Sequence, residues 1–327
     1  MKGRVLVIEN EAEARRSLTF GLTREEYDVT FCPDGVSAIR ELKSAQEKDK
    51  PYTHIITDIF MPDIDGIGML KAIKIRYPGL PVIVITGFGD EALKSTVLSE
   101  PGTAYFDKPF EFSDLVKALD NLSAESSASD AAKVDAVEDA RESAAAYLAI
   151  RITEPARSLE ILKELRGIDG VERCDAVRGD FDVVIVARGG SRGEVEKLKE
   201  RIGSIQGIEI VFASDVVRPE LDQEVDEFIR VYSRTIKACC VASPDGQSGR
   251  TSYIFVNIDK KAIQRILTAV VFSEGIVFCD VIDDGAALAA MVAGQGVAGA
   301  TPRISGKLGR IDGVLRVREA AVIRLAE

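Results

Sequence analysis

The sequence predicts a doubly wound α/β domain with a five-stranded parallel sheet, followed by two smaller α+β domains. In residues 1–122, five short apolar runs alternate with segments whose apolar residues recur at helical spacing. Residues 146–218 instead predict the order strand, helix, strand, strand, helix, strand, and residues 251–327 repeat this order more loosely. We therefore expect three domains of ordinary size.

The predicted strands of the first domain are the runs RVLVI, YDVTFC, HIITD, PVIVIT and AYFDK, which end in turn or charged residues. Helices are predicted between them at 11–24, 35–46, 66–76, 90–98 and 111–122. Strands that are joined through helices need right-handed crossovers, so they form a parallel sheet with helices on both faces. Such a sheet collects its functional residues at the carboxyl ends of its strands.

Residues 123–145 are predicted to be a linker. The segment is acidic, rich in Ala and Ser, and poor in large apolar side chains, so it lacks an apolar stripe with which to pack. An exposed helical spacer is the alternative, because alanine favours helix.

The second half of the chain shows a pattern that occurs twice. Residues 146–218 have the element order of a ferredoxin-like fold, with a hairpin turn at Gly179–Asp180. Residues 219–250 predict an amphipathic helix and a flexible loop. The run GIDGVERCDAV in the first unit is echoed by SEGIVFCDVI in the second, which indicates an internal duplication at a spacing of about 105 residues.

Composition excludes several classes of protein. A net charge of -11 over 327 residues argues against a general affinity for nucleic acid, and no reading helix with a basic face is visible. No apolar run is long enough to span a membrane, and the N-terminus does not resemble a signal peptide. Five cysteines without regular spacing predict reduced thiols. We therefore expect a cytoplasmic protein with no membrane or direct nucleic-acid partner.

The chain has a single histidine, His54. Catalysis by Ser-His or Cys-His pairs would have to use this residue. It opens a predicted buried strand, where a structural role is expected. Outside the first domain no acid, base and nucleophile converge in the sequence, so we do not expect a metabolic enzyme.

Four segments of the first domain carry a family resemblance: VLVIENE (5–11), DIFMPDIDG (58–66), VITG (84–87) and FDKPF (106–110). Together they resemble the receiver domain of two-component response regulators, which has a flavodoxin-like fold. The resemblance implies that Asp58 accepts a phosphoryl group while Lys108 and Thr86 stabilise its charge. It further implies that Tyr105 is the aromatic switch that turns inward when Thr86 moves.

The resemblance also implies a magnesium site formed by Glu9, Asn10, Asp58 and the backbone carbonyl of Phe60. Here the sequence departs from the family, because Asn10 stands where a carboxylate ligand is expected. Magnesium binds through carboxylates and retains water, so losing one anionic ligand is expected to weaken it. Glu11 could supply a second carboxylate through water. A pseudo-receiver that works without phosphorylation therefore stays open.

A second acidic motif overlaps the first. Asp63 and Asp65 match the D-x-D-G opening of haloacid-dehalogenase-type phosphatases. That motif must end a buried strand, but Pro62 precedes it and cannot join a central ladder. We interpret Asp65 as the cap of a helix that starts near Gly66.

Residues 146–218 resemble the effector-binding, ACT-like (RAM) domain of Lrp/AsnC-type regulators, through their element order and the run VRGDFDVVIV (177–186), and residues 251–327 resemble it only in outline, as a degenerate second copy. This resemblance implies an amino-acid-like effector at Gly179, Asp180 and Asp182, with second-copy counterparts Asp283, Asp284 and Gly285. A plain hairpin turn is the alternative. We expect a homo-oligomer, and the two copies could pair within one chain or between chains.

The combined prediction is a response regulator of a two-component phosphorelay that receives its phosphoryl group from a sensor histidine kinase or phosphotransfer protein. It would signal through the tandem ACT-like module by the face of its fourth helix, fifth strand and fifth helix. An interaction scaffold and a transcription regulator that acts through a DNA-binding partner are the alternatives.

Overall fold

The computed structural model describes residues 2–59, 61, 66–87, 89, 91–126, 144–241, 251–273, 275–293 and 306–323. The chain divides into two compact units. The first unit comprises Met1–Asp135, Leu221–Ala242 and Thr268–Glu274, and the second comprises Ala136–Glu220, Ser243–Leu267 and Gly275–Glu327.

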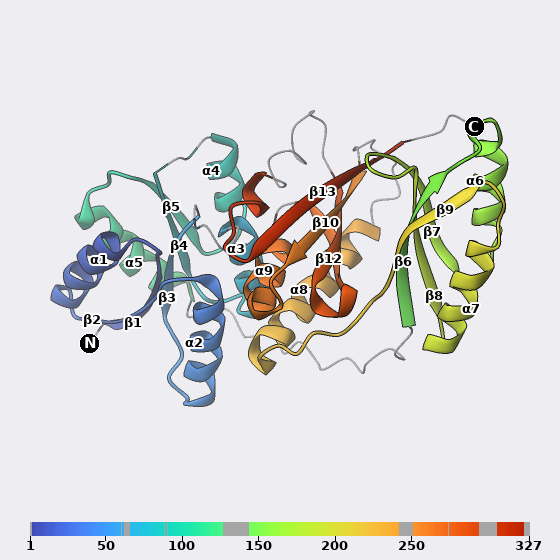
Figure 1. Ribbon diagram of the computed structural model, residues 1–327. Coiled ribbons are helices and arrows are strands. Elements are labelled where there is room, and N and C mark those ends of the chain that lie inside the picture. Colours follow the sequence, from blue (N-terminus) through green and yellow to red (C-terminus); the bar gives the residue numbers. More distant parts are fainter. Residues whose placement is uncertain are drawn as a thin grey trace. The chain divides into compact units, whose positions relative to one another are not determined.

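The first unit contains a five-stranded sheet in the order β2-β1-β3-β4-β5 (Figure 1). Its strands are β1 (Gly3–Ile8), β2 (Tyr27–Cys32), β3 (His54–Asp58), β4 (Val82–Thr86) and β5 (Thr103–Asp107). Every pairing in this sheet is parallel. The predicted parallel five-stranded sheet is confirmed.

Helices cover both faces of this sheet. They are α1 (Ala12–Arg24), α2 (Gly35–Glu47), α3 (Gly66–Arg76), α4 (Glu91–Leu98) and α5 (Phe112–Ser126). Helices α1 and α5 lie on one face, and α2, α3 and α4 lie on the other (Figure 1). Strands β3 and β4 are buried along their whole length, as expected for a parallel sheet covered on both sides.

The predicted linker is shorter than expected at both ends. Helix α5 continues to Ser126 and strand β6 begins at Ala144, so residues at each end of 123–145 belong to regular elements. No Gly or Pro interrupts the sequence from Phe112 to Ser126, so the helix continues past Leu122, which is buried.

The first unit also contains α8 (Gln223–Val241), the amphipathic helix predicted between the two copies. Its buried residues include Val225, Phe228 and Tyr232. The rings of Phe228 and Tyr232 pack edge-on against Phe272, with centroids 6.0 and 4.8 Å away.

The second unit contains an eight-stranded sheet in the order β11-β12-β10-β13-β7-β8-β6-β9. All pairings within it are antiparallel. Its strands are β6 (Ala144–Ile152), β7 (Val171–Arg178), β8 (Val183–Gly189), β9 (Ile208–Asp215), β10 (Thr251–Ile258), β11 (Ile276–Ile282), β12 (Ala287–Ala293) and β13 (Val314–Val322).

Both halves of this sheet have the same internal plan. The first four strands are ordered β7-β8-β6-β9 and the second four β11-β12-β10-β13, so each half reads second, third, first, fourth strand. Helices α6 (Ser158–Arg166) and α9 (Ile263–Val271) follow the first strand of each half after a 3-10 turn, η1 (Pro155–Arg157) or η2 (Lys260–Ala262). Helix α7 (Arg192–Gly203) joins β8 to β9. This matching order supports the predicted duplication.

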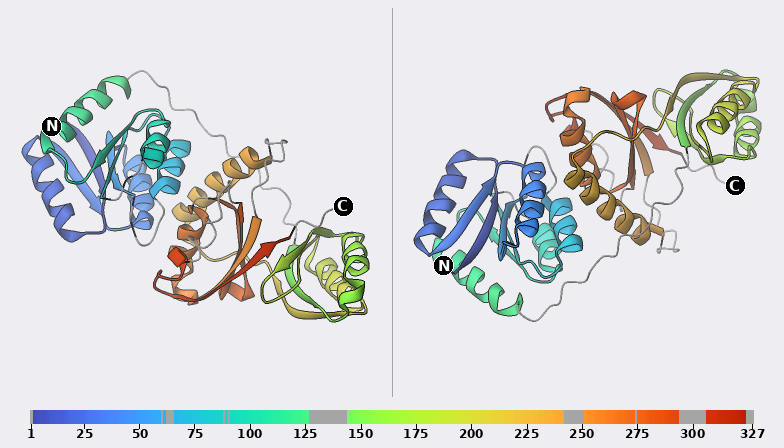
Figure 2. Two further views of the ribbon diagram at one scale, coloured as in Figure 1. Left: turned by 90° about the horizontal axis from the view of Figure 1, so that it is seen from above. Right: turned by 90° about the horizontal axis from the view of Figure 1, so that it is seen from below.

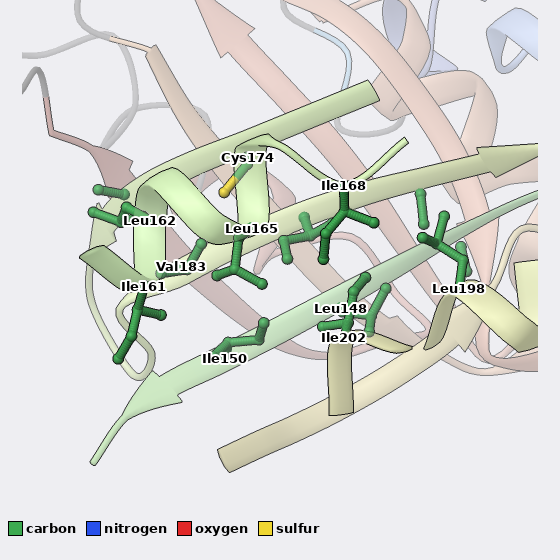
Figure 3. Close-up of a cluster of buried hydrophobic side chains, with 14 of the residues drawn as sticks. Leu148, Ile150, Ile161, Leu162, Leu165, Ile168, Cys174, Val183, Leu198 and Ile202 are labelled. Carbon is green, nitrogen blue, oxygen red and sulfur yellow. The ribbon is translucent and has the colours of Figure 1, made fainter. Parts of the chain in front are cut away.

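The first repeat has its own apolar core beneath its helices. Helices α6 and α7 lie on the same side of β6–β9 (Figure 2). Ile161, Leu165 and Ile202 from these helices pack against Leu148 and Ile150 of β6 (Figure 3). The helices cover only one face of β6, yet all residues from Ala145 to Ile150 are buried.

The second face of β6 is covered by the other repeat. Tyr147 and Ala149 belong to an apolar cluster that also contains Tyr253, Phe255 and Met291. Alternate residues of one strand thus enter two different cores, because successive strand side chains point to opposite faces. The two copies pair within one chain.

Hydrogen bonds between strand edges join the repeats as well. Strand β13 pairs with β7 at Ala321–Arg178 and Val322–Val177. An isolated antiparallel bridge, Val217–Val281, joins the chain after β9 to β11. The segment that follows the edge strand β9 therefore meets the opposite edge strand, β11.

Among the described helices, none has the length and apolar content needed to cross a membrane.

Candidate functional site

The predicted receiver residues gather at the carboxyl edge of the parallel sheet. Asp58 is the last residue of β3 and Thr86 is the last residue of β4. Glu9 follows β1, and Lys108 follows β5. Parallel pairing brings these strand ends to one edge of the sheet, as the sequence predicts.

Lys108 bridges two carboxylates at this edge. Its Nζ donates to Asp58 Oδ2 at 2.8 Å and to Glu9 Oε2 at 2.9 Å. The Glu9 side chain is 3% exposed and that of Asp58 is 10% exposed. Burial acts to lower the pKa of Lys108, but the bonds to Asp58 and Glu9 outweigh it, so the pKa is raised and the amine stays cationic.

Hydrogen bonds to backbone atoms hold the end of β1 and the start of the segment after β5. Glu9 Oε1 accepts a hydrogen bond from the Glu11 backbone N–H at 3.0 Å. Arg15 donates to the backbone carbonyls of Glu9 and Asn10 at 2.8 and 2.7 Å. The Lys108 N–H donates to the Thr86 carbonyl at 2.7 Å. The sequence did not reveal Arg15, because its contact is to backbone atoms and leaves no motif.

Thr86 and Tyr105 differ in exposure. Thr86 is completely buried. Tyr105 is half-buried, and its hydroxyl donates to Asp107 Oδ1 at 2.8 Å. A side chain at Gly89 would collide with that hydroxyl, so Gly89 lies against Tyr105.

The donors available for a magnesium ion are all oxygens. Asp58 and Glu9 supply carboxylates, while Asn10 is exposed and offers a neutral amide. The Phe60 carbonyl lies outside the described residues. Within the described part of the chain, no group of three His, Cys, Asp or Glu side chains forms a metal cluster. The donor chemistry fits a hard cation, but with two carboxylates in place of three.

The residues of the competing phosphatase motif, Asp63 and Asp65, lie outside the described residues, as does Pro62. Gly66 is described and begins α3, as predicted. Its N–H donates to the Ile59 carbonyl at 3.2 Å. An added Cβ at Gly66 would lie 2.4 Å from Ile59 Cα and 3.0 Å from the Asp58 carbonyl oxygen, so only glycine allows α3 to start this close to β3.

His54 has the structural position that the sequence predicts. It is completely buried, and its Nε2 lies 3.0 Å from the Leu119 carbonyl oxygen. Burial lowers the pKa of its imidazole despite this hydrogen bond.

The predicted effector residues of the first repeat form the turn between β7 and β8. Asp182 Oδ2 accepts a hydrogen bond from the Ile152 N–H at 2.8 Å, and its backbone bonds to Ile150 and Val177. The Asp180 carbonyl accepts from Arg151 at 3.4 Å. These contacts give Asp182 a role in holding the hairpin.

The counterpart residues of the second repeat also form a turn. Asp283, Asp284 and Gly285 have φ values of 53, 50 and 87°. Asp284 forms an ion pair with Lys260 at 3.0 Å, and the Asp283 N–H donates to Ser214 Oγ at 2.7 Å. Two aspartates in the left-handed region are unusual, and this conformation is one that Asp tolerates better than most residues.

Two cavities of the first repeat lie away from the predicted effector residues. One of about 470 Å³ is lined by residues of α6 and the end of α7, including Lys163 and Arg201. A second of about 370 Å³ lies along β7 and β8 beside Glu172 and Arg188. Neither is lined by Gly179, Asp180 or Asp182.

Comparison with known proteins agrees with the geometry of the first unit. The family described as "Response regulator receiver domain" matches residues 5–120. The response regulator receiver protein CpdR of Brucella abortus (strain 2308) is 31% identical over 119 residues, which are 36% of this chain and 95% of CpdR. The transcriptional regulatory protein FixJ of Bradyrhizobium diazoefficiens is 31% identical over 136 residues, which cover 42% of this chain and 63% of FixJ.

A response regulator receiver domain protein from Clostridium thermocellum is similar in structure at 27% identity. The match covers 38% of this chain and 96% of that chain, with a TM-score of 0.35. A probable transcriptional regulatory protein from Picosynechococcus sp. is 28% identical and is matched over only 47% of its length. Because CpdR is matched over almost its whole length and the receiver family covers residues 5–120, the chain belongs to the response regulators through its N-terminal receiver domain.

Proposed function

We propose that this protein is the response regulator of a two-component phosphorelay, that Asp58 accepts the phosphoryl group, and that residues 146–327 form its output module. The contact of Lys108 with both Asp58 and Glu9 carries the proposal. It places a cation beside a strand-end carboxylate, as phosphoryl transfer to that carboxylate requires.

In the proposed reaction, an Asp58 carboxylate oxygen attacks the phosphorus of the donor. A bond from Asp58 oxygen to phosphorus forms while the bond to the donor's leaving group breaks. Lys108 offsets the negative charge of the transferred group, and Thr86 donates its hydroxyl to a phosphoryl oxygen. A bound magnesium ion would be held by Asp58, Glu9 and Asn10 and would neutralise the phosphoryl oxygens.

Incubation with acetyl phosphate and magnesium, followed by intact mass spectrometry, tests this proposal. We expect a mass increase of one phosphoryl group in the parent and none in Asp58→Asn. Asp114→Asn, which changes an exposed carboxylate of α5 in the same way, serves as the control and should keep the full mass increase. An increase in Asp58→Asn would refute Asp58 as the acceptor.

A phosphorylation-independent pseudo-receiver is the second candidate, and the exposed amide of Asn10 favours it. This candidate predicts no mass increase with acetyl phosphate or with a partner histidine kinase. Restoration of phosphorylation by Asn10→Asp would show that residue 10 alone separates the two functions.

For the C-terminal half, we propose two ferredoxin-like, ACT-like domains at 146–218 and 251–327. Their matching strand orders and 3-10 turns support this assignment. A small amino-acid-like effector would bind near Gly179 and Asp180. Calorimetric titration with the twenty amino acids, repeated on Asp180→Asn, tests the effector, and loss of a binding signal in that variant is expected.

We further propose that α8 takes part in output. Glu227 of α8 accepts from Lys43 of α2 at 2.8 Å and pairs with Arg76 of α3 at 3.2 Å. The bond to Lys43 lowers the pKa of Glu227, so the carboxylate stays charged at neutral pH. Because α3 starts at Gly66 against β3 and ends at Arg76, it connects the Asp58 strand end to α8.

This route would act beside the face of α4, β5 and α5 suggested by the family resemblance. Hydrogen exchange of the full chain with and without a phosphoryl mimic distinguishes them. Altered exchange in α8 and α3 supports the first route, and altered exchange in α4 and α5 supports the second.

A further inference from the structure

The repeats of the second unit exchange equivalent hydrogen bonds. Tyr147 donates to Asp280 Oδ2 at 2.6 Å, and Tyr253 donates to Asp175 Oδ2 at 2.6 Å. The two tyrosines are 106 positions apart and the two aspartates 105, which is the spacing of the duplication. Each repeat therefore gives its partner the same bond that it receives, so an approximate two-fold axis relates them.

Residues that the duplication relates and that also touch each other must lie beside this axis. Two such pairs occur. The Arg173 guanidinium lies 6.0 Å from the ring centroid of Phe278, 105 positions later. The Arg318 guanidinium lies 5.7 Å from the ring of Phe212, 106 positions earlier.

In both pairs, one repeat supplies the cation and the other the aromatic ring. Guanidinium groups over aromatic rings attract each other, and the attraction grows where water is excluded. Within the described residues, Arg318 Nε is buried and has no hydrogen-bond partner, and the guanidinium faces the ring of Phe212.

Pairing of like repeats would lose these contacts. Two first repeats related by the same axis would set Arg173 against its own copy. Two second repeats would set Arg318 against its own copy. Each like pair thus sets two guanidinium groups against each other and gives neither of them a ring, while in the unlike pair each guanidinium faces a ring of the other repeat.

We propose that Arg173–Phe278 and Phe212–Arg318 are the specificity determinants that make the first repeat pair with the second and not with another first repeat. The C-terminal half is then a two-fold dimer contained in one chain. Its paired sheet faces are already covered, and association between chains has to use other surfaces.

A disulfide trap tests whether the pairing is within one chain. Arg178 and Ala321 face each other across β7 and β13, and a directly opposed antiparallel pair has the Cα separation that a disulfide needs. Arg178→Cys with Ala321→Cys is oxidised in the full chain, digested and mapped by mass spectrometry. Arg178→Cys alone is the control for bonds to the native cysteines.

We expect the 178–321 disulfide in a species with the mass of one chain. The same disulfide in a species of two chains would overturn pairing within the chain, since the repeats would then be exchanged between molecules. Absence of the bond after complete oxidation would overturn the contact of β7 with β13.

A charge swap tests the determinants. Phe278→Arg places a second guanidinium against Arg173, and we expect hydrogen exchange in β7 and β11 to become roughly tenfold faster or more. Arg173→Phe combined with Phe278→Arg restores one cation over one ring. Arg173 Nε donates to Asp175 and to the Tyr253 hydroxyl, and the duplication gives Asp280 and Tyr147 the matching positions for an arginine at residue 278.

We therefore expect the double variant to exchange more slowly than Phe278→Arg, close to the parent. Leu315→Arg adds the same charge at a 72% exposed position and is expected to have little effect. Equal exchange in the double variant and in Phe278→Arg would overturn the assignment of Arg173 and Phe278.

Discussion

Lys108 contacts Asp58, the proposed phosphoryl acceptor, through the same nitrogen that it offers to Glu9. The three groups carry a net charge of about -1, and replacing the lysine leaves two buried carboxylates without their cation. Lys108→Ala is therefore expected to have opposite effects on two steps. Phosphorylation by acetyl phosphate should slow at least about tenfold, because transferred charge is no longer offset.

Magnesium binding by the same Lys108→Ala variant should become tighter, since the carboxylate oxygens are freed. Calorimetry measures the affinity, and timed intact mass measures the rate. Lys117→Ala, which removes an exposed lysine paired with Asp114, is the control. Weaker magnesium binding in Lys108→Ala would contradict the competition between lysine and metal.

Asn10→Asp should strengthen magnesium binding, because it adds an anionic oxygen donor beside Glu9. An increase of about tenfold in affinity is expected at low ionic strength. Asn121→Asp adds the same charge on the exposed side of α5 and serves as control. Equal affinity of Asn10→Asp and the parent would show that residue 10 lies outside the metal's reach.

Glu227→Gln should loosen α8 from α2 and α3, because it removes the charge that Lys43 and Arg76 share. The Glu227 side chain is 44% exposed, so solvent screens the pairs and the effect is modest. Hydrogen exchange in α2 should become roughly two- to fivefold faster. Asp226→Asn removes a carboxylate that pairs with Arg230 on the same helix, and it should leave α2 unchanged.

The single histidine gives a direct measure of pH dependence. The pKa of buried His54 lies below its ordinary value of 6.5, so between the two values the unfolded chain binds more protons than the folded one. The free energy of unfolding of the first domain should therefore fall as the pH drops below about 6.5.

Proton NMR follows the only imidazole of the chain during this titration. Its midpoint is expected below 6.5, and His54→Asn should flatten the stability profile between about pH 7 and 5.5. A midpoint at or above the ordinary value would contradict the buried, neutral imidazole.

The sequence located Asp58, Thr86 and Lys108 because parallel strands collect their carboxyl ends at one edge, and each residue ends or follows an apolar run. The sequence also identified the duplication, because similar runs of residues recur in the equivalent strands of the two repeats. The partner of β6 was not predictable, since the run from Ala145 to Ile150 is apolar on both faces and does not indicate what covers either face. Helix α8 has a clear apolar stripe, but periodicity does not reveal that Glu227 would contact Lys43 and Arg76.

The pairs beside the approximate axis have a consequence for the history of the chain. In an assembly of two identical subunits, a residue on the axis contacts only its own copy. A substitution there appears in both subunits at once, so the new side chain has to pack against an identical side chain. Once both repeats are encoded in one gene, the two equivalent positions beside the axis mutate separately. Arg173 and Phe278 are a combination that separate encoding permits.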